Sequence, residues 1–371
     1  MSADALTVSK TPAAKLNLLG LSADDLVRFF ASLDQRPYRA RQIMQWLYRR
    51  GVLDFNAMTD LSLDLRERLG DIAVLDVPAV SSCTVSRDGT RKWLLDVGGG
   101  QAVETVFIPE LKRGTLCISS QAGCVLDCAF CATGSSGFNR NLTAAEILGQ
   151  VLLAGRELGP DAISNVVFMG MGEPLANYRS VLPVVRLLID DRAFGLSRRR
   201  VTISTAGLVP QIRKLAGECN VALAVSLHAP DDSLRNELVP INRVHPIEEL
   251  LDACWRYAEV LASRHVTFEY VMLDKVNDSP AQARALIRLL KNRPAKVNLI
   301  PFNSHPGSSF RCSTASAIDT FWQILWSAGI VATIRRPRGD DIDAACGQLA
   351  GRVLDRRRVR FSEKLRGASH L

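Results

Sequence analysis

The sequence has no long apolar segment and no leader-like start. None of its apolar runs approaches the ~20 residues that a helix needs to cross a bilayer. The first residues also lack the basic head, the continuous apolar block and the small-residue cleavage site that together mark a secretory signal. We therefore expect a cytoplasmic protein without a membrane-spanning segment, in a compartment where disulfides are rare.

Paired cysteines, internal repeats and low-complexity linkers are also missing. The nine cysteines are an odd number with scattered spacing, which argues against a disulfide framework and favours metal binding or thiol chemistry. At 371 residues the chain is long enough for a large core and for two or three domains.

The charge of the chain is unevenly distributed. The formal net charge is +8, and residues 352–371 contribute five of these charges, with seven basic side chains against two acidic ones. A further basic run, at 198–200, precedes a predicted strand. Such clusters can neutralise the phosphates of a nucleic acid. They can equally form a solvated surface that promotes solubility, and charge alone does not decide between the two.

The first 95 residues differ in pattern from the rest of the chain. Ser22 and Asp25 have the spacing of a capping box in front of an apolar helical face. In residues 38–51 three apolar side chains share one helical face, and four arginines surround it. We expect residues 1–95 to form a small helical domain with a basic rim, which ends in a linker to the next domain.

Alternating strands and helices dominate the remainder. Asp88-Gly89 and a run of three glycines first indicate the connecting β-hairpin. From residue 113 to residue 335, about six units of a continuously apolar strand and an amphipathic helix follow, which predicts a parallel sheet covered by helices. Six units are too few for a closed eight-fold barrel. The predicted fold is α/β, a partial (β/α)6 TIM-like barrel over residues 96–350, followed by a basic C-terminal tail at 351–371.

Short polar or glycine-rich segments follow the predicted strands. In parallel β/α architectures the reacting groups lie on loops after the carboxyl ends of the strands. We therefore expect these segments to form one site. They are residues 124–131, "MGMGEP" (169–174), "STAG" (204–207), "SLHAP" (226–230) and "PFNSHPG" (301–307).

Three cysteines, Cys124, Cys128 and Cys131, lie within the first of these segments. A structural zinc site requires four ligands, and no second pair of cysteines lies nearby. Thiolates also hold iron-sulfur clusters, and a 4Fe-4S cluster with three cysteine ligands leaves one iron open for another ligand. A lone trio could also pack in the core or form half of a zinc site. Its position after the first strand of a β/α sheet favours the cluster.

The C-x-x-x-C-x-x-C spacing, with Phe130 before the last cysteine, resembles the radical S-adenosylmethionine superfamily. The resemblance implies that the open iron binds the amino and carboxylate groups of S-adenosylmethionine, which is then cleaved reductively to a 5′-deoxyadenosyl radical. "MGMGEP" is similar to the motif that contacts the methionine end. Gly170 and Gly172 allow a close approach of the backbone, and Glu173 can accept a hydrogen bond from the amine.

Two further cysteines narrow the resemblance. Cys346 lies in "GDDIDAACGQLA", a polar loop after the last strand, and Cys117 lies in the first strand. Together with "QAGCVLDCAFCATG", these surroundings closely resemble the dual-specificity RNA methyltransferases that methylate carbon 2 of adenine in 23S ribosomal RNA and in transfer RNA. The resemblance covers almost the whole chain and is less diagnostic in the first few residues and in the tail.

This resemblance implies a mechanism that uses both cysteines and two molecules of S-adenosylmethionine per turnover. The first would methylate Cys346, and the radical from the second would take a hydrogen atom from that methyl group. The resulting carbon radical would add to the adenine ring. Cys117 would then attack the Cys346 sulfur and form a transient disulfide, for which the two Cα atoms must come within roughly 4.4 to 6.8 Å.

The same matching implies roles for other residues. Glu104 would be the proton acceptor, with a pKa raised by an apolar pocket, although strand alternation alone equally allows an exposed surface carboxylate. The residues implied to bind S-adenosylmethionine are Gly172, Glu173, Ser204, Ser226, Leu227, His228 and Asn303. Taken alone, His228 is more often a structural residue. The remaining cysteines are expected to be packing thiols: Cys83, Cys219, Cys254 and Cys312.

The implied partners are 23S ribosomal RNA before ribosome assembly is complete, transfer RNA and a reduced electron donor such as flavodoxin, with a monomeric enzyme. A base must leave its stack to reach the radical, and residues 1–95 with the tail could hold the surrounding RNA backbone. Two alternatives remain open. One is methylation of carbon 8 by the same machinery, and the other is an RNA-binding protein with a purely structural cluster.

Overall fold

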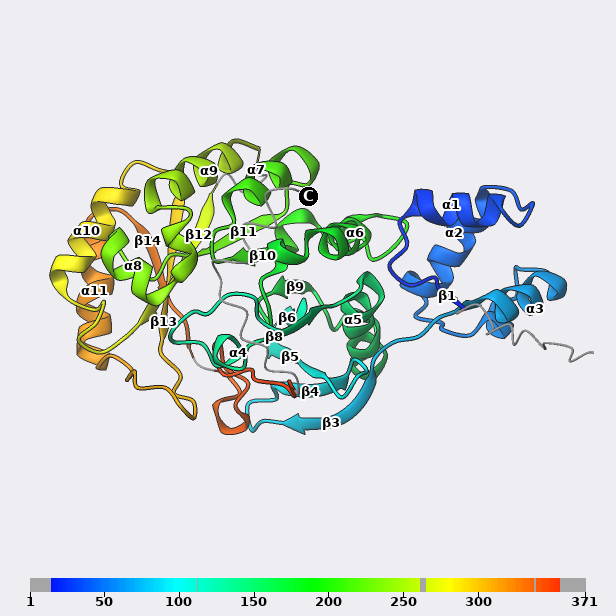
Figure 1. The fold of residues 1–371 in the computed structure, drawn as a ribbon, viewed down its shortest axis with the longest axis horizontal. Helices are drawn as coiled ribbons and strands as arrows, with labels where there is room; N and C mark the ends of the chain where they lie inside the picture. The colour runs from blue at the N-terminus through cyan, green and yellow to red at the C-terminus, as the bar shows by residue number, and fades with distance from the viewer. Residues whose placement is uncertain (1–14, 112, 261–264, 337, 354–371) are drawn as a thin grey trace, which may run out of the picture.

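The computed structural model describes residues 15–111, 113–260, 265–336 and 338–353. A ten-stranded sheet in the order β14-β13-β12-β11-β10-β9-β6-β5-β4-β3 forms its centre (Figure 1). Seven of these strands are parallel to one another. They are β6 (Arg113–Cys117), β9 (Asn165–Phe168), β10 (Val201–Thr205), β11 (Ala222–Ser226), β12 (Val266–Met272), β13 (Ala295–Pro301) and β14 (Val331–Ile334).

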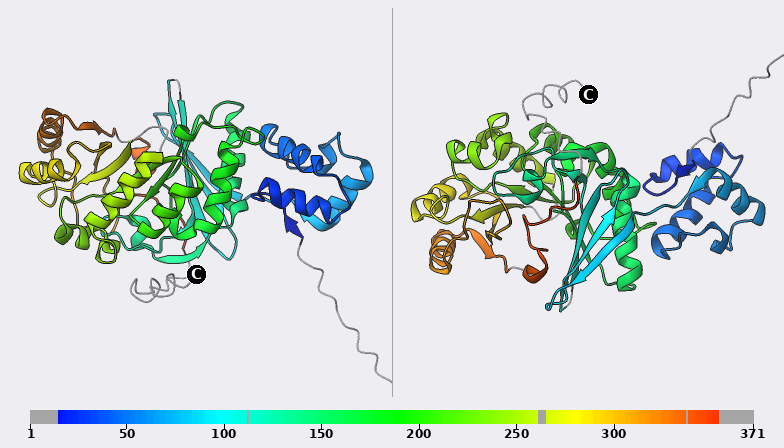
Figure 2. Two further views of the ribbon diagram at one scale, coloured as in Figure 1. Left: turned by 90° about the horizontal axis from the view of Figure 1, so that it is seen from above. Right: turned by 60° about the horizontal axis from the view of Figure 1, so that its bottom comes forward.

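Each step between neighbouring parallel strands contains at least one helix, so the predicted partial β/α barrel is confirmed. The crossover helices are α5 (Ala144–Leu158), α6 (Tyr178–Ile189), α7 (Val209–Glu218), α8 (Asp232–Leu238), α9 (Ile247–Val260), α10 (Pro280–Leu290) and α11 (Ala315–Ser327). They lie on the outside of the curved sheet (Figures 1 and 2). The helices thereby cover the outer face of the parallel strands, whereas β14 at the edge of the sheet stays largely exposed.

The predicted hairpin is present, but its strands are part of the large sheet. β3 (Ala79–Val85), β4 (Arg91–Asp96) and β5 (Ala102–Glu110) form an antiparallel meander, and β5 pairs with β6. Gly89, with φ +82°, allows the tight turn between β3 and β4. A division of the chain after residue 95 falls inside β4, so the hairpin and the barrel share one continuous hydrogen-bonded sheet.

The N-terminal residues form a small helical unit beside α5 and α6 (Figures 1 and 2). Its elements are β1 (Leu16–Asn17), α1 (Ala23–Ala31), α2 (Tyr38–Met44), a π-helical turn (Gln45–Arg49), α3 (Leu63–Ile72) and β2 (Ala73–Val74). The capping box of Ser22 and Asp25 is confirmed at the start of α1. The unit packs on the barrel through Tyr48, whose ring centroid lies 5.4 Å from that of Phe194.

A short segment that leaves the barrel contains the cysteine trio. It runs between β7 (Gln121–Gly123) and β8 (Phe138–Asn141), which pair with each other, and it contains the short helix α4 (Ala132–Ser135). No described helix combines the length and the apolarity that a bilayer crossing requires. Apart from residues 351–353, the predicted basic tail lies outside the described residues.

Candidate active site

The loop between β7 and β8 brings the three cysteines of the trio together. One cavity, the larger of two, is lined by all three of them: Cys124, Cys128 and Cys131. The volume of this larger cavity is about 950 Å³, including the part that is open to solvent. Gly123 starts this loop with φ +81°, and a Cβ atom there would lie 2.0 Å from the carbonyl oxygen of Gly137. Only glycine fits this crossing of the two backbones, so the chain can turn sharply into the cysteine loop.

The three thiols are suitable ligands for an iron-sulfur cluster, which cysteine thiolates hold. Among the described residues, no group of three cysteine, histidine or acidic side chains is placed to hold a single metal ion. Burial and the neighbouring thiols raise the pKa of Cys124 and Cys128 above the usual range. These thiols would therefore be deprotonated only in the presence of a strong cation, and metal binding must release their protons.

Glu173 reaches the same cavity from the end of β9. Its side chain accepts hydrogen bonds from the backbone N–H groups of Leu175 (3.0 Å) and Ala206 (2.8 Å). Burial raises its pKa to about 7. Gly172, with φ +98°, precedes it, and a Cβ atom there would lie 2.5 Å from the Cβ atom of Gln121. The carboxylate is thus aimed into the larger cavity with capacity left for a cationic ligand.

The strand ends bring most of the other expected ligand-binding residues to this cavity. Ser204, Ser226 and His228 line it, together with Phe130, whose ring meets that of His228 edge-on at 4.7 Å between centroids. Leu227 is fully buried and does not line the cavity.

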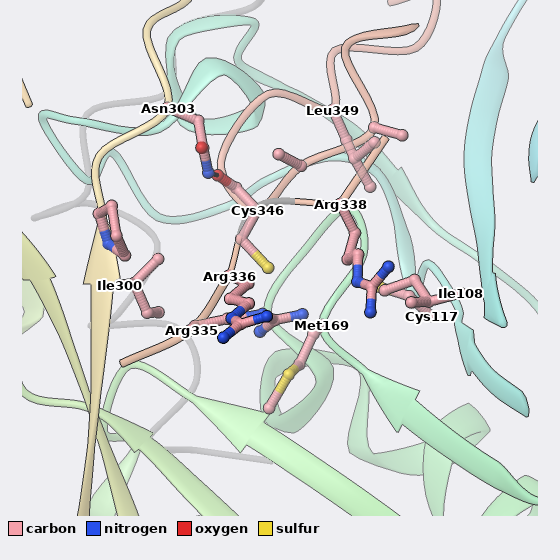
Figure 3. Close-up of a pocket in the computed structure, with 13 residues that line it drawn as sticks. Ile108, Cys117, Met169, Ile300, Asn303, Arg335, Arg336, Arg338, Cys346 and Leu349 are labelled. Carbon is pink, nitrogen blue, oxygen red and sulfur yellow. Dashed lines mark hydrogen bonds between the residues drawn. The ribbon is translucent and has the colours of Figure 1, made fainter. Parts of the chain in front are cut away.

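Figure 3 shows a second, smaller cavity of about 480 Å³, including open solvent. It adjoins the larger cavity, because Arg335 and Cys346 line both. Cys117 and Cys346 both line it and both are free thiols. Burial raises the pKa of Cys117 to about 12. Cys346 also lines the larger cavity, so it lies where the two cavities meet. Asn303 lines the smaller cavity and donates a hydrogen bond to the carbonyl oxygen of Cys346 at 3.1 Å.

A direct backbone hydrogen bond joins the cysteine trio to the Cys346 loop. The N–H of Ala132, next to Cys131, donates to the carbonyl oxygen of Gly347, next to Cys346, at 2.9 Å. More than 200 residues separate the two loops in the chain. The fold therefore places both at one end of the barrel.

Glu104 is buried, so it is not a surface carboxylate, but it does not line either cavity. One carboxylate oxygen forms an ion pair with Lys92 at 3.1 Å. The other accepts hydrogen bonds from the backbone N–H groups of Ala350 (2.8 Å) and Gly351 (3.2 Å). Its surroundings are therefore polar rather than the apolar pocket expected from the sequence, and it fastens the segment after Cys346 to β5.

Three charged residues of the site had no expected role. Arg335 lines both cavities, and the neighbouring Cys346 side chain raises its pKa. Glu269 lines the larger cavity and accepts a hydrogen bond from Asn298 at 2.8 Å. Arg235 lies behind that cavity, fully buried. For Glu269 the sequence did contain a signal, because a charged residue stands within an otherwise apolar strand. Nothing in the sequence around Arg235 distinguishes it from a surface helix residue.

The expectation that the four remaining cysteines are packing thiols is confirmed for two of them and wrong for the other two. Cys219 and Cys254 are buried packing thiols. Cys83 and Cys312 are exposed, so the expectation is wrong for these two. Cys83 lies on β3, which ends the sheet, and no further strand of the described chain covers it.

Comparison with known proteins adds to this geometry. Residues 16–75 match the family described as the ribosomal RNA large subunit methyltransferase N-terminal domain, and residues 118–287 match the radical SAM superfamily. The chain is similar to the crystal structure of a radical SAM methyltransferase from Sphaerobacter thermophilus, with 45% identity and a TM-score of 0.85, over 90% of this chain and 99% of that one. A domain of pyruvate-formate lyase-activating enzyme from Bacteroides vulgatus is 19% identical, with a TM-score of 0.36, over 47% and 99% of the two chains. This second likeness is too slight to support an argument.

Proposed function

Because this chain belongs to the radical S-adenosylmethionine methyltransferases that modify large-subunit ribosomal RNA, we propose that it methylates carbon 2 of an adenine in 23S ribosomal RNA and in transfer RNA. The observation that carries the proposal is the position of Cys346. Its side chain lines both the cavity of the cysteine trio and the cavity of Cys117. A methyl group on this sulfur would face the source of the radical on one side and an incoming base on the other.

The family implies a 4Fe-4S cluster and S-adenosylmethionine. We place the cluster on Cys124, Cys128 and Cys131, and when bound it supplies the electron that cleaves S-adenosylmethionine. The larger cavity would hold the S-adenosylmethionine. Glu173 would accept hydrogen bonds from its amino group, and the close backbone at Gly172 would leave room for its methionine end.

The remaining contacts to S-adenosylmethionine would come from the ends of three other strands, β10, β11 and β13. Hydroxyl, imidazole and amide groups suit the ribose, carboxylate and adenine edges. The proposed residues are Ser204, Ser226, Leu227, His228 and Asn303. Leu227 would contribute only by positioning its neighbours, because its side chain is fully buried and its backbone N–H already donates to the carbonyl oxygen of Glu269.

Both reactive thiols belong to this chain. Cys346 would accept a methyl group from a first S-adenosylmethionine, and this group would lose a hydrogen atom after cleavage of a second. The carbon radical would then bond to carbon 2 of adenine, and the resulting radical adduct would lose its carbon 2 proton to Glu104 and its unpaired electron to an acceptor, for which the oxidised cluster is the available group. Cys117 would attack the Cys346 sulfur; the sulfur–carbon bond breaks, and its electron pair goes to the methylene carbon, which takes up a proton and becomes the methyl group. A dithiol reductant would then reduce the disulfide.

Glu104 is the proposed acceptor of the carbon 2 proton. In the described conformation both of its oxygens are engaged, by Lys92 on one side and by Ala350 and Gly351 on the other. Accepting a proton therefore requires the segment after Cys346 to release the carboxylate. Binding of RNA in the smaller cavity would cause this release.

RNA would be held outside the cavities by basic surfaces. The proposed division of the chain assigns this role to the helical residues 1–95 and to the tail at 351–371, with the barrel between them. Arg36, Arg41, Arg49 and Arg50 are exposed on the helical unit, and the guanidinium of Arg50 lies 4.0 Å from the ring centroid of Trp46. Exposed arginines of this kind suit phosphates. We propose that the enzyme is a cytoplasmic monomer that receives its electron from a donor such as flavodoxin.

The decisive experiment is anaerobic reconstitution with iron and sulfide, followed by assay on transfer RNA and ribosomal RNA fragments with a labelled methyl donor. We expect label on Cys346 and on adenine carbon 2. Mass mapping of the methyladenosine isomers separates carbon 2 from carbon 8. Reconstituted protein that labels neither RNA nor Cys346 would refute the proposal, and label on carbon 8 would correct it.

A further inference from the structure

Arg235 on α8 is the least exposed charged side chain near the site, with a relative exposure of 0%. Its guanidinium donates four hydrogen bonds. The acceptors are the carbonyl oxygens of Leu227 (3.1 Å), Ala206 (2.6 Å) and Ser226 (3.0 Å) and the side-chain oxygen of Asn242 (2.7 Å). The three carbonyl groups lie at the carboxyl ends of β10 and β11. One side chain therefore ties together two strand ends that border the larger cavity.

The positive charge of Arg235 has no ion-pair partner in the part of the chain that the structure describes. Burial lowers its pKa to about 10, so the guanidinium is still charged near neutral pH. The acidic groups near enough to act on it electrostatically are Cys128, Cys254 and Asp232. Buried charges are normally paired with an opposite charge or bound to a metal site, because removal from water is costly. An anionic partner of Arg235 is therefore to be expected nearby.

The cysteine trio is the nearest candidate for this partner, since Cys128 is the acidic group that acts most strongly on the pKa of Arg235. α8 ends at Leu238, and the carbonyl oxygen of Leu238 accepts a hydrogen bond from the backbone N–H of Ala129 at 3.1 Å. Ala129 directly follows Cys128. The helix that carries Arg235 is thus in direct contact with the proposed cluster loop. A cluster held by three thiolates is anionic, and it becomes more negative when it is reduced.

We propose that Arg235 acts as a positioning residue for the cofactor cavity and, by its charge, makes the iron-sulfur cluster easier to reduce. This inference rests on the proposed binding of the cluster by the trio. The fork of the guanidinium holds the ends of β10 and β11 in register for S-adenosylmethionine. Its positive charge favours the reduced, more negative cluster in a site of low dielectric, and the reduction potential is accordingly higher than without it.

Two substitutions separate the hydrogen bonds of Arg235 from its charge. R235M removes both, whereas R235K keeps a cation that cannot reach all four acceptors. R213M is the matched control, because Arg213 is a half-exposed cation on α7, the helix that precedes α8 in the chain, and lines neither cavity. The reconstituted proteins are titrated with dithionite under electron paramagnetic resonance detection, and S-adenosylmethionine affinity is measured by equilibrium binding.

We expect R235M to shift the midpoint potential to a lower value and to weaken S-adenosylmethionine binding by about 10-fold, the effect of losing a charged hydrogen-bond donor. R235K should keep the wild-type midpoint and still bind about 10-fold more weakly. R213M should match the wild type in both measurements.

Unchanged potential in folded R235M overturns the electrostatic role, and unchanged affinity in R235K overturns the positioning role. If R235M does not fold, R235K still decides, because a midpoint below that of the wild type would show that the charge is not what sets the potential. Wild-type protein without any cluster signal would refute the proposed cofactor site rather than the role of Arg235.

Discussion

The Nδ1 atom of His228 accepts a hydrogen bond from the backbone N–H of Val271 at 3.0 Å. This bond sets the tautomer of the ring, since Nδ1 carries the lone pair and Nε2 carries the proton. Burial lowers the pKa of His228 to about 3, so the ring is neutral at physiological pH. His228 therefore presents an N–H donor that does not depend on pH.

This relationship predicts a pH dependence of stability in the apo protein. The unfolded His228 binds a proton below its usual pKa of about 6.5, and the folded one does not. The free energy of unfolding should therefore decrease as the pH falls below about 6.5, by up to about 1.4 kcal/mol per pH unit from this group. Urea denaturation of wild-type and H228Q proteins at several pH values measures the slope. Equal slopes for the two proteins would contradict the prediction.

The binding of S-adenosylmethionine should depend on the ionisation of Glu173. Its pKa is raised to about 7 by burial, so at pH 6 most of the carboxyl groups are protonated and do not attract the amino group. Affinity should therefore increase as the pH rises from about 6 to about 8 and then level off. E173Q should bind about 10-fold more weakly, without this pH dependence. Equilibrium binding at constant ionic strength tests both expectations, and a pH-dependent E173Q would assign the titration to another group.

Substitution of each of the two thiols of the smaller cavity should stop the reaction at a different stage. C346A should transfer no methyl group, because the sulfur proposed to carry it is gone. C117A should still attach RNA to Cys346 and then be unable to release it. Denaturing gels with labelled RNA detect such a covalent complex. C83A serves as the control, because Cys83 is exposed and lines neither cavity. Free methylated RNA from C117A at the wild-type rate would contradict the proposed role of Cys117.

Substitution of Glu104 should block the reaction after the base has been attached. E104Q removes the proposed proton acceptor, and we expect turnover to fall by about 100-fold or more. Methylation of Cys346 does not need this acceptor and should persist. Mass spectrometry of the peptide around Cys346 measures it. Loss of that methylation in E104Q would instead mean that Glu104 acts only by holding the loop, through Ala350 and Gly351.

Gly123 and Gly137 form a matched pair for the cysteine loop. Both have φ +81°, but an added Cβ atom would clash with the Gly137 carbonyl oxygen only at Gly123 and would meet open space at Gly137. G137A should cost about 1–2 kcal/mol from the backbone conformation alone. G123A should cost about 3 kcal/mol or more and reduce the iron bound per protein. Thermal unfolding and iron analysis compare the two, and equal losses would show that the close crossing is unimportant.

The sequence was sufficient for features that depend on local chemistry. Apolar runs alternating with amphipathic helices predict the parallel sheet, because period and composition follow from burial on both faces. The capping box at Ser22 also follows from neighbouring residues alone. The segments after each strand could be assigned to one site, because parallel strands end at the same edge. The clustering of Cys124, Cys128 and Cys131 is visible in their spacing.

Only the tertiary structure decided which distant groups meet. It brings Cys117 and Cys346 to one cavity, adds the predicted hairpin to the large sheet, and buries Glu104 beside Lys92. It also shows Arg235 fully buried, with its hydrogen bonds directed to two strand ends. Packing decides which group lies within a few ångströms of a buried charge and can act as its partner. Residues far apart in the chain supply that partner, so local sequence carries almost no information about it.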